Sequence, residues 1–169
     1  MQEPTTTEKM LDAERDVQAR LGDRAIDFDA NRAISNIYRA AAAVRRRAER
    51  GLLKEYGLSW GGFTILWVLW IWGEMETANL ARECDLAKGT LTGMLTTLEK
   101  RDLVERQRSP TDGRRVLVNA TAVGAEMIES LFPRFNELEV DMAGGLTAEE
   151  TRELSRLLRK VITTPDPQP

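Results

Sequence analysis

Four arginines cluster in one short stretch of the chain, where they could contact the phosphates or grooves of DNA. They flank the turn-forming residues 109–113 and are Arg106, Arg108, Arg114 and Arg115. Arginine placed in a narrow minor groove is a known way of reading DNA shape. Asp112 lies two residues before Arg114, close enough in a tight turn to orient its guanidinium or to cap the turn. A single arginine could be an ordinary solvated charge, but the cluster favours a DNA-binding loop.

A second group of candidate DNA contacts precedes this loop, on a predicted helix over residues 88–101. Leu91, Met94, Leu95 and Leu98 recur at helical spacing and predict one buried stripe. The opposite face has only small, hydroxyl-bearing or cationic side chains: Lys88, Gly89, Thr90, Thr92, Gly93, Thr96 and Thr97. A merely solvated face is the alternative interpretation. We expect Thr90, Thr92 and Thr96 to meet base edges and Lys88 to meet phosphate.

The elements around these residues complete a winged helix-turn-helix. Residues 103–108 and 116–120 have strand-like patterns separated by a turn, which predicts a hairpin, or wing. Residues 76–83 predict a short helix that ends at Cys84 and Asp85, and aspartate tolerates the left-handed conformation of a tight turn. The fold class is therefore mainly α with a small β-hairpin wing, an α+β arrangement that places the helix at 88–101 in the major groove.

The flanking segments predict helices that have no partner inside so small a domain. Apolar residues recur at helical spacing over 29–53, 121–143 and 147–162, the first predicted as one long helix. The unpartnered stripes favour pairing with a second chain. The expected division is a partly helical N-terminal extension at 1–28, dimerisation helices at 29–57 and 121–164, a DNA-binding domain at 58–120 and a disordered tail at 165–169.

Two segments carry a resemblance to a known family. LAKGTLTGMLTTLEKRDLVER, from Leu86, and TDGRRVLVNATAVG, from Thr111, resemble the recognition helix and wing of the MarR family of bacterial transcription regulators. The resemblance spans residues 31–162 and implies a two-fold dimer on a near-palindromic operator in double-stranded DNA. Asp112 and Arg114 match the Asp-Xaa-Arg motif of the family's wing. Gly93 departs from the larger polar or basic residue that many members carry in the recognition helix.

Residues 60–73 are apolar nearly all round and predict a buried helix, which Ser59 could cap. The resemblance implies that relatives bind aromatic or anionic effectors near the start of this helix. Trp60, Phe63 and Trp67 are therefore candidates for holding a small flat effector, although core packing is the simpler role for most of the tryptophans. An effector that prefers a conformation with badly spaced recognition helices would release DNA.

Composition excludes several function classes. The chain carries a net charge of -3, has one cysteine and lacks histidine, so the usual zinc sites cannot form and no cofactor is expected. It has no glycine-rich phosphate loop, which argues against an enzyme. No apolar run could span a membrane and no secretory signal is recognisable, so we expect a cytoplasmic protein without a membrane partner.

The sequence thus predicts a ligand-responsive DNA-binding regulator, most simply a repressor. The alternative is a winged helix used for protein contacts or as an architectural module without operator specificity. A redox sensor using Cys84 is a weaker alternative, because that residue suits a small buried position. Residues 82–115 contain eight Lys or Arg against six Asp or Glu, a net of +2 that leaves -5 elsewhere, so positive charge is modestly concentrated in the predicted DNA-binding region.

Overall fold

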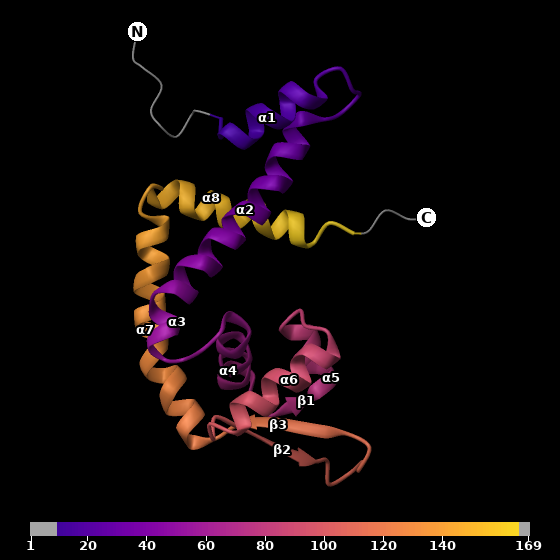
Figure 1. Cartoon of the computed structure of the whole chain (residues 1–169), viewed down its shortest axis with the longest axis vertical. Helices are drawn as coiled ribbons and strands as arrows, with labels where there is room; N and C mark the ends of the chain where they lie inside the picture. Colours follow the sequence, from indigo (N-terminus) through magenta and orange to yellow (C-terminus); the bar gives the residue numbers. More distant parts are fainter. Residues whose placement is uncertain (1–9, 166–169) are drawn as a thin grey trace. The chain divides into compact units, whose positions relative to one another are not determined.

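The computed structural model describes residues 10–165 (Figure 1). The chain forms two compact units, the first ending at Arg46 and the second beginning at Arg47. The first nine residues of the expected N-terminal extension, and all of the expected tail at 165–169 except Pro165, lie outside the described residues. Within residues 10–165, no helix is both long and apolar enough to cross a membrane.

The first unit contains α1 (Asp12–Leu21) and most of α2 (Phe28–Arg50), which continues into the second unit. Polar contacts join the two helices: the Asn36 amide donates to the Glu14 carboxylate at 2.7 Å, and Arg32 donates to the Gln18 side-chain oxygen at 3.3 Å. Two apolar side chains of α2, Ile34 and Tyr38, remain exposed.

The second unit is the winged helix-turn-helix together with its flanking helices, as the sequence predicts. Its elements in order are α3 (Leu52–Glu55), α4 (Trp60–Trp72), β1 (Met75–Glu76), α5 (Thr77–Glu83), α6 (Lys88–Glu99), β2 (Val104–Arg108), β3 (Val116–Ala120), α7 (Ala122–Ala143) and α8 (Ala148–Ile162). The single long helix expected over 29–53 is wrong in one detail: α2 stops at Arg50, and α3 begins after Gly51, whose backbone is not helical.

Side-chain caps fix where three helices begin. The Ser59 hydroxyl accepts from the Gly62 N–H ahead of α4, and the Thr121 hydroxyl accepts from the Gly124 N–H ahead of α7. Thr147 and Glu150 form a reciprocal capping box at the start of α8. Each cap satisfies an N–H group that would otherwise lack a partner in the first turn, so the sequence sets these boundaries locally.

The expected hairpin belongs to a three-stranded antiparallel sheet with the order β1-β3-β2. Val118 of β3 pairs with Met75 of β1 on one side and with Arg106 of β2 on the other, and its side chain is buried. The prediction missed β1 because two residues are too few to show an alternating pattern.

Helix α4 is the centre of the core and lies between α7 and α6 (Figure 1). Ile65, Leu66, Val68 and Leu69 are buried there, as its apolar sequence predicts. Burial all round is wrong for the last turn, where Trp70, Ile71 and Trp72 are exposed, although the Trp70 ring still lies 5.7 Å from the Phe132 ring of α7. An apolar run alone does not reveal where the covering elements end.

Gly124 is the position where a side chain is least tolerable. A Cβ atom there would overlap the carbonyl oxygen of Leu103, because the first turn of α7 lies directly on the chain leaving α6. We expect Gly124→Ala to lower the free energy of unfolding by about 2 kcal/mol or more, since backbone would have to move. Chemical denaturation followed by circular dichroism measures this.

The matched control is Gly93→Ala in α6, where nothing lies within 4 Å of the position that an added Cβ atom would take. Alanine there should raise the free energy of unfolding by up to about 1 kcal/mol, because it gains helix propensity without a clash. Equal effects of the two substitutions would contradict the close approach at Gly124.

Candidate nucleic-acid interface

Helices α5 and α6 form a helix-turn-helix with a hydrogen-bonded turn. Leu80 and Ala81 of α5 are buried, and the Leu86 N–H donates to the Ala81 carbonyl at 2.8 Å across the turn. Asp85 adopts the left-handed conformation expected for it, with φ of 50°. The turn therefore directs α6 away from α5 at a defined angle, as a groove-reading helix requires.

Helix α6 has one buried face and one bare face. Leu91, Leu95 and Leu98 are buried in the core, and Met94 is half-buried against Gly61 of α4. All seven residues assigned to the opposite face are exposed: Lys88, Gly89, Thr90, Thr92, Gly93, Thr96 and Thr97. The structure thus brings the predicted recognition residues together on one accessible surface.

Three threonines of this face use their hydroxyl protons within the helix. Thr92, Thr96 and Thr97 donate to the carbonyls four residues earlier, at 2.9, 3.0 and 3.1 Å. Each hydroxyl oxygen can still accept a hydrogen bond, although that of Thr96 already accepts one from Arg106 Nη2 at 3.3 Å. Acceptor oxygens and threonine methyl groups suit base amino groups and the thymine methyl. Within the described residues, the Thr90 hydroxyl has no such bond and remains free to donate.

The start of α6 is weakly capped. Ala87 occupies the cap position and supplies no side-chain hydrogen bond, as its residue type predicts. Nothing lies within 4 Å of the position that a side chain on Gly89 would take. A phosphate could therefore approach the free N–H groups of the first turn closely, beside the exposed Lys88 ammonium.

The wing tip is organised by side-chain hydrogen bonds. The Ser109 hydroxyl accepts from the backbone N–H groups of Thr111 and Asp112, both at 3.3 Å. Asp112 accepts from the Arg114 backbone N–H at 3.1 Å, so it caps the turn, one of the two roles predicted for it. Asp112 was also expected to orient the Arg114 guanidinium, but it orients that of Arg115 instead. The second carboxylate oxygen of Asp112 accepts a hydrogen bond from Arg115 at 3.2 Å.

The four wing arginines differ in how free they are. Arg106 forms an ion pair with Glu99 of α6, and Arg115 pairs with Glu76 at 2.6 Å as well as with Asp112. Glu99 raises the pKa of Arg106, and Glu76 does the same for Arg115, so both stay charged but are internally neutralised. Within the described residues, the guanidinium groups of Arg108 and Arg114 have no such partner. Sequence inspection missed Glu99 and Glu76 because an isolated carboxylate carries no sign of its partner.

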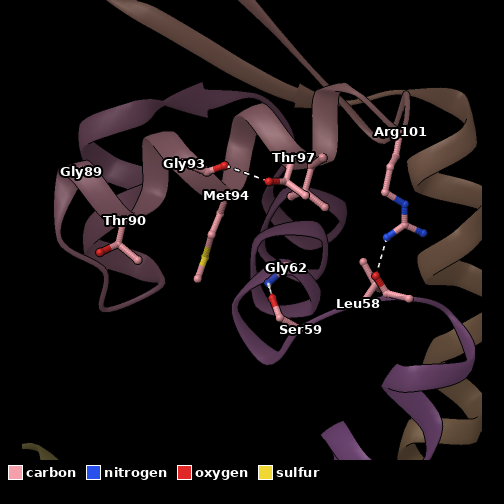
Figure 2. A pocket seen from close by; sticks show the side chains of 11 residues that line it. Leu58, Ser59, Gly62, Gly89, Thr90, Gly93, Met94, Thr97 and Arg101 are labelled. Atoms are coloured by element: carbon pink, nitrogen blue, oxygen red, sulfur yellow. Dashed lines mark hydrogen bonds between the residues drawn. The ribbon is translucent and has the colours of Figure 1, made fainter.

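A cavity of about 300 Å³ lies between α6 and the start of α4 (Figure 2). Met94 points into it from α6, and Ser59 and Gly62 border it from α4. Arg101 closes one end by donating to the carbonyls of Tyr56 at 2.8 Å and Gly57 at 2.6 Å. Arg101, which the sequence did not single out, thereby ties the end of α6 to the turn before α4.

The residues predicted to hold an effector are divided between two aromatic groups. The rings of Trp60 and Phe63 lie 5.9 Å apart, and the Phe135 ring of α7 lies 6.1 and 4.5 Å from them. Trp67 instead packs edge-on against Trp72, with ring centres 5.5 Å apart. The indole N–H of Trp67 is buried and has no hydrogen-bond partner among the described residues.

Cys84 lies half-buried at the end of α5. Burial, with a smaller contribution from the adjacent Glu83 carboxylate, raises the pKa of its thiol to about 11. A thiol with that pKa is almost entirely protonated at neutral pH, and the protonated form is a poor nucleophile. The environment of Cys84 therefore opposes its use as a redox sensor.

Comparisons with known proteins agree with this geometry. Residues 58–116 match the model of the MarR family. An HTH-type transcriptional regulator of Bacillus subtilis, YwaE, is 35% identical over 137 residues, which cover 81% of this chain and 80% of the relative.

Two solved structures share the fold. A mutant of MarR from E. coli complexed with operator DNA is 27% identical, with a TM-score of 0.67 over 75% of this chain and 91% of that one. NadR in complex with 4-hydroxyphenylacetate is 26% identical, with a TM-score of 0.65 over 77% and 92% of the two chains.

Proposed function

We propose, since the chain belongs to the MarR family of DNA-binding transcription regulators, that it acts as a dimeric, ligand-responsive repressor of a near-palindromic operator. Its relatives are regulators, which confirms the expectation that the chain is not an enzyme. The observation that carries the DNA-binding mode is the bare face of α6 beside a wing with two free arginines, Arg108 and Arg114. In this mode α6 enters the major groove and the wing lies along the minor groove.

Arg114 has the strongest claim to a minor-groove contact. It is exposed at the wing tip, its backbone is fixed by Asp112, and its guanidinium is not engaged within the described part of the chain. A side chain whose backbone is already ordered loses less entropy on binding. The MarR structure with operator DNA supports this placement by its shared fold.

Removal of this side chain tests the DNA-binding mode. We expect Arg114→Ala to weaken binding to the operator by about 1 to 3 kcal/mol, because a desolvated groove contact is lost. Fluorescence anisotropy at fixed salt, with DNA from upstream of the protein's own coding region and unrelated DNA as competitor, measures the affinity.

The control is Arg152→Ala, which removes the same charge from exposed α8. It should leave affinity nearly unchanged. Equal affinities for wild type and Arg114→Ala would remove Arg114 from the interface, and equal competition by any DNA would overturn operator specificity.

Association of two chains is supported by an uncovered helix face. Helix α8 buries none of its residues, yet Leu154, Leu157, Val161 and Ile162 recur along one side and are all exposed. An apolar stripe of this kind is unfavourable in water unless it is covered. Two-fold pairing would cover it and place two recognition helices on one operator.

Polar substitutions on this stripe should dissociate the dimer. We expect Leu154→Gln with Leu157→Gln to yield a monomer at micromolar concentration, because the apolar area that favours association is removed. Analytical ultracentrifugation reports the mass. The control places glutamines on the polar side of the same helix, as Arg152→Gln with Arg159→Gln, and should stay dimeric. A dimer in both variants would exclude this stripe as the interface.

Effector binding is the remaining part of the proposal. The Trp60, Phe63 and Phe135 rings supply aromatic surface. Trp67, in the second aromatic group with Trp72, has a buried N–H without a partner among the described residues. The NadR structure holds 4-hydroxyphenylacetate, a small aromatic acid, so we expect this class of ligand to bind here and shift the protein to a conformation with lower DNA affinity.

A ligand titration separates this role from core packing. An aromatic acid that binds should change the tryptophan fluorescence saturably and weaken operator binding over the same concentration range. Trp60→Phe should alter the ligand affinity more than Trp70→Phe, which changes an exposed tryptophan of the same helix that packs on Phe132 and on none of the candidate residues. Absence of any saturable change across a panel of aromatic acids would contradict the effector site.

A further inference from the structure

A charged hydrogen-bond network joins the recognition helix to the wing. The Arg106 guanidinium donates to one Glu99 oxygen at 2.8 Å through Nε and to the other through Nη2. The same Nη2 also lies 3.3 Å from the Thr96 hydroxyl. The Arg106 and Glu99 side chains are each only 28% exposed, so the ion pair is partly shielded from water.

This network is more rigid than an ordinary surface ion pair. Two parallel hydrogen bonds between a guanidinium and a carboxylate fix orientation as well as distance. Arg106 is itself held in register, because it pairs with Val118 in the centre of the sheet. Glu99 is the last residue of α6. The contact therefore ties the end of one reading element to the strand that carries the other.

A second connection holds the opposite side of the wing. Arg115 pairs with Glu76 of β1 at 2.6 Å and with Asp112 of the tip at 3.2 Å. Arg106 and Arg115 are thus each paired with carboxylates of this chain, whereas Arg108 and Arg114 are exposed and have no such partner among the described residues. The Glu99 pair is the better shielded of the two, since Arg115 is 56% exposed.

We infer that Glu99 and Arg106 form a positioning pair, which sets the wing relative to α6 so that major-groove and minor-groove contacts can form at once. The inference rests on the proposed DNA-binding mode. It also revises the sequence-based assignment of Arg106 to the DNA-contacting residues. A misplaced wing would have to be ordered during binding, and that ordering would reduce affinity.

The rival interpretation is that Arg106 contacts phosphate and Glu99 merely offsets its charge. The two interpretations predict opposite changes in DNA affinity for the substitution Glu99→Gln. Glu99→Gln removes a negative charge near DNA, so it should tighten binding if Arg106 is a phosphate ligand. It should weaken binding if the pair positions the wing, although the protein becomes more positive.

We expect Glu99→Gln to bind the operator about three- to tenfold more weakly than wild type, the range of a coupled pair. The dependence of affinity on salt should stay close to that of wild type, because no phosphate contact is lost. Loss of a phosphate contact would instead lower the slope by about 1 per contact. Tighter binding by Glu99→Gln would overturn the inference.

Glu105→Gln is the matched control. Glu105 is exposed on β2, next to Arg106, so its substitution changes the net charge equally in nearly the same place. It should bind DNA as tightly as wild type or slightly more tightly. Glu99→Arg with Arg106→Glu, which keeps the net charge and reverses the pair, should recover at least part of the lost affinity. If the reversed pair recovers no affinity and Arg106→Gln binds the operator as tightly as wild type, the positioning role of the pair is contradicted.

Hydrogen exchange of the free protein gives a readout that needs no DNA. Glu99→Gln should speed exchange of the amides at 104–120, whereas Glu105→Gln should not. Thermal unfolding checks that both variants fold, and Arg106→Lys, which keeps charge but loses the two-pronged contact, replaces Glu99→Gln if that variant unfolds.

The two proposals can fail separately. Wild type that shows no preference for its own upstream DNA contradicts the proposed function, while unchanged exchange in Glu99→Gln contradicts the positioning pair. Specific binding by wild type with equal affinity of Glu99→Gln also rejects the positioning pair and leaves the proposed function standing.

Discussion

Helix α6 must be held along one face and left bare along the other, and most of the second unit serves that requirement. Leu91, Leu95 and Leu98 hold it on the core, where burial of large apolar side chains contributes about 1.5 to 3 kcal/mol each. Gly61 allows Met94 to approach α4 more closely than any larger residue would. Arg101 then fixes the far end of α6 to the turn at 56–57. The DNA-facing side of α6 stays exposed because the opposite side of the helix makes the contacts with the core.

Charge within the wing is distributed in a way that composition conceals. The chain is net negative, at -3, so its overall charge does not attract DNA, and any electrostatic contribution to affinity must come from the local excess of positive charge at 82–115. Two of the four wing arginines are neutralised by carboxylates from α6, β1 and the tip itself. The free positive charge is therefore small and local, which limits non-specific binding and makes affinity depend on the placement of a few side chains.

Local signals in the sequence were enough to predict most elements, while long-range pairings were not. The caps at Ser59, Thr121 and Thr147 and the left-handed Asp85 follow from residue type, because each acts on its own backbone. Strand β1 could not be predicted, since two residues become a strand only by pairing with β3.

The ion-pair partners of the wing were hidden for a related reason. Any of several carboxylates could have met Arg106 or Arg115, and only the folded arrangement of α6 and the sheet selects Glu99 and Glu76.

The hydrogen-bonding capacity of the exposed α6 face was also not evident from the sequence, because most of its threonine hydroxyls donate to the helix itself. That face offers acceptors and methyl groups, with Thr90 and Lys88 as its donors. Guanine presents only acceptors in the major groove, so it can be matched only near the start of α6, while the middle of the helix suits adenine or cytosine amino groups and the thymine methyl.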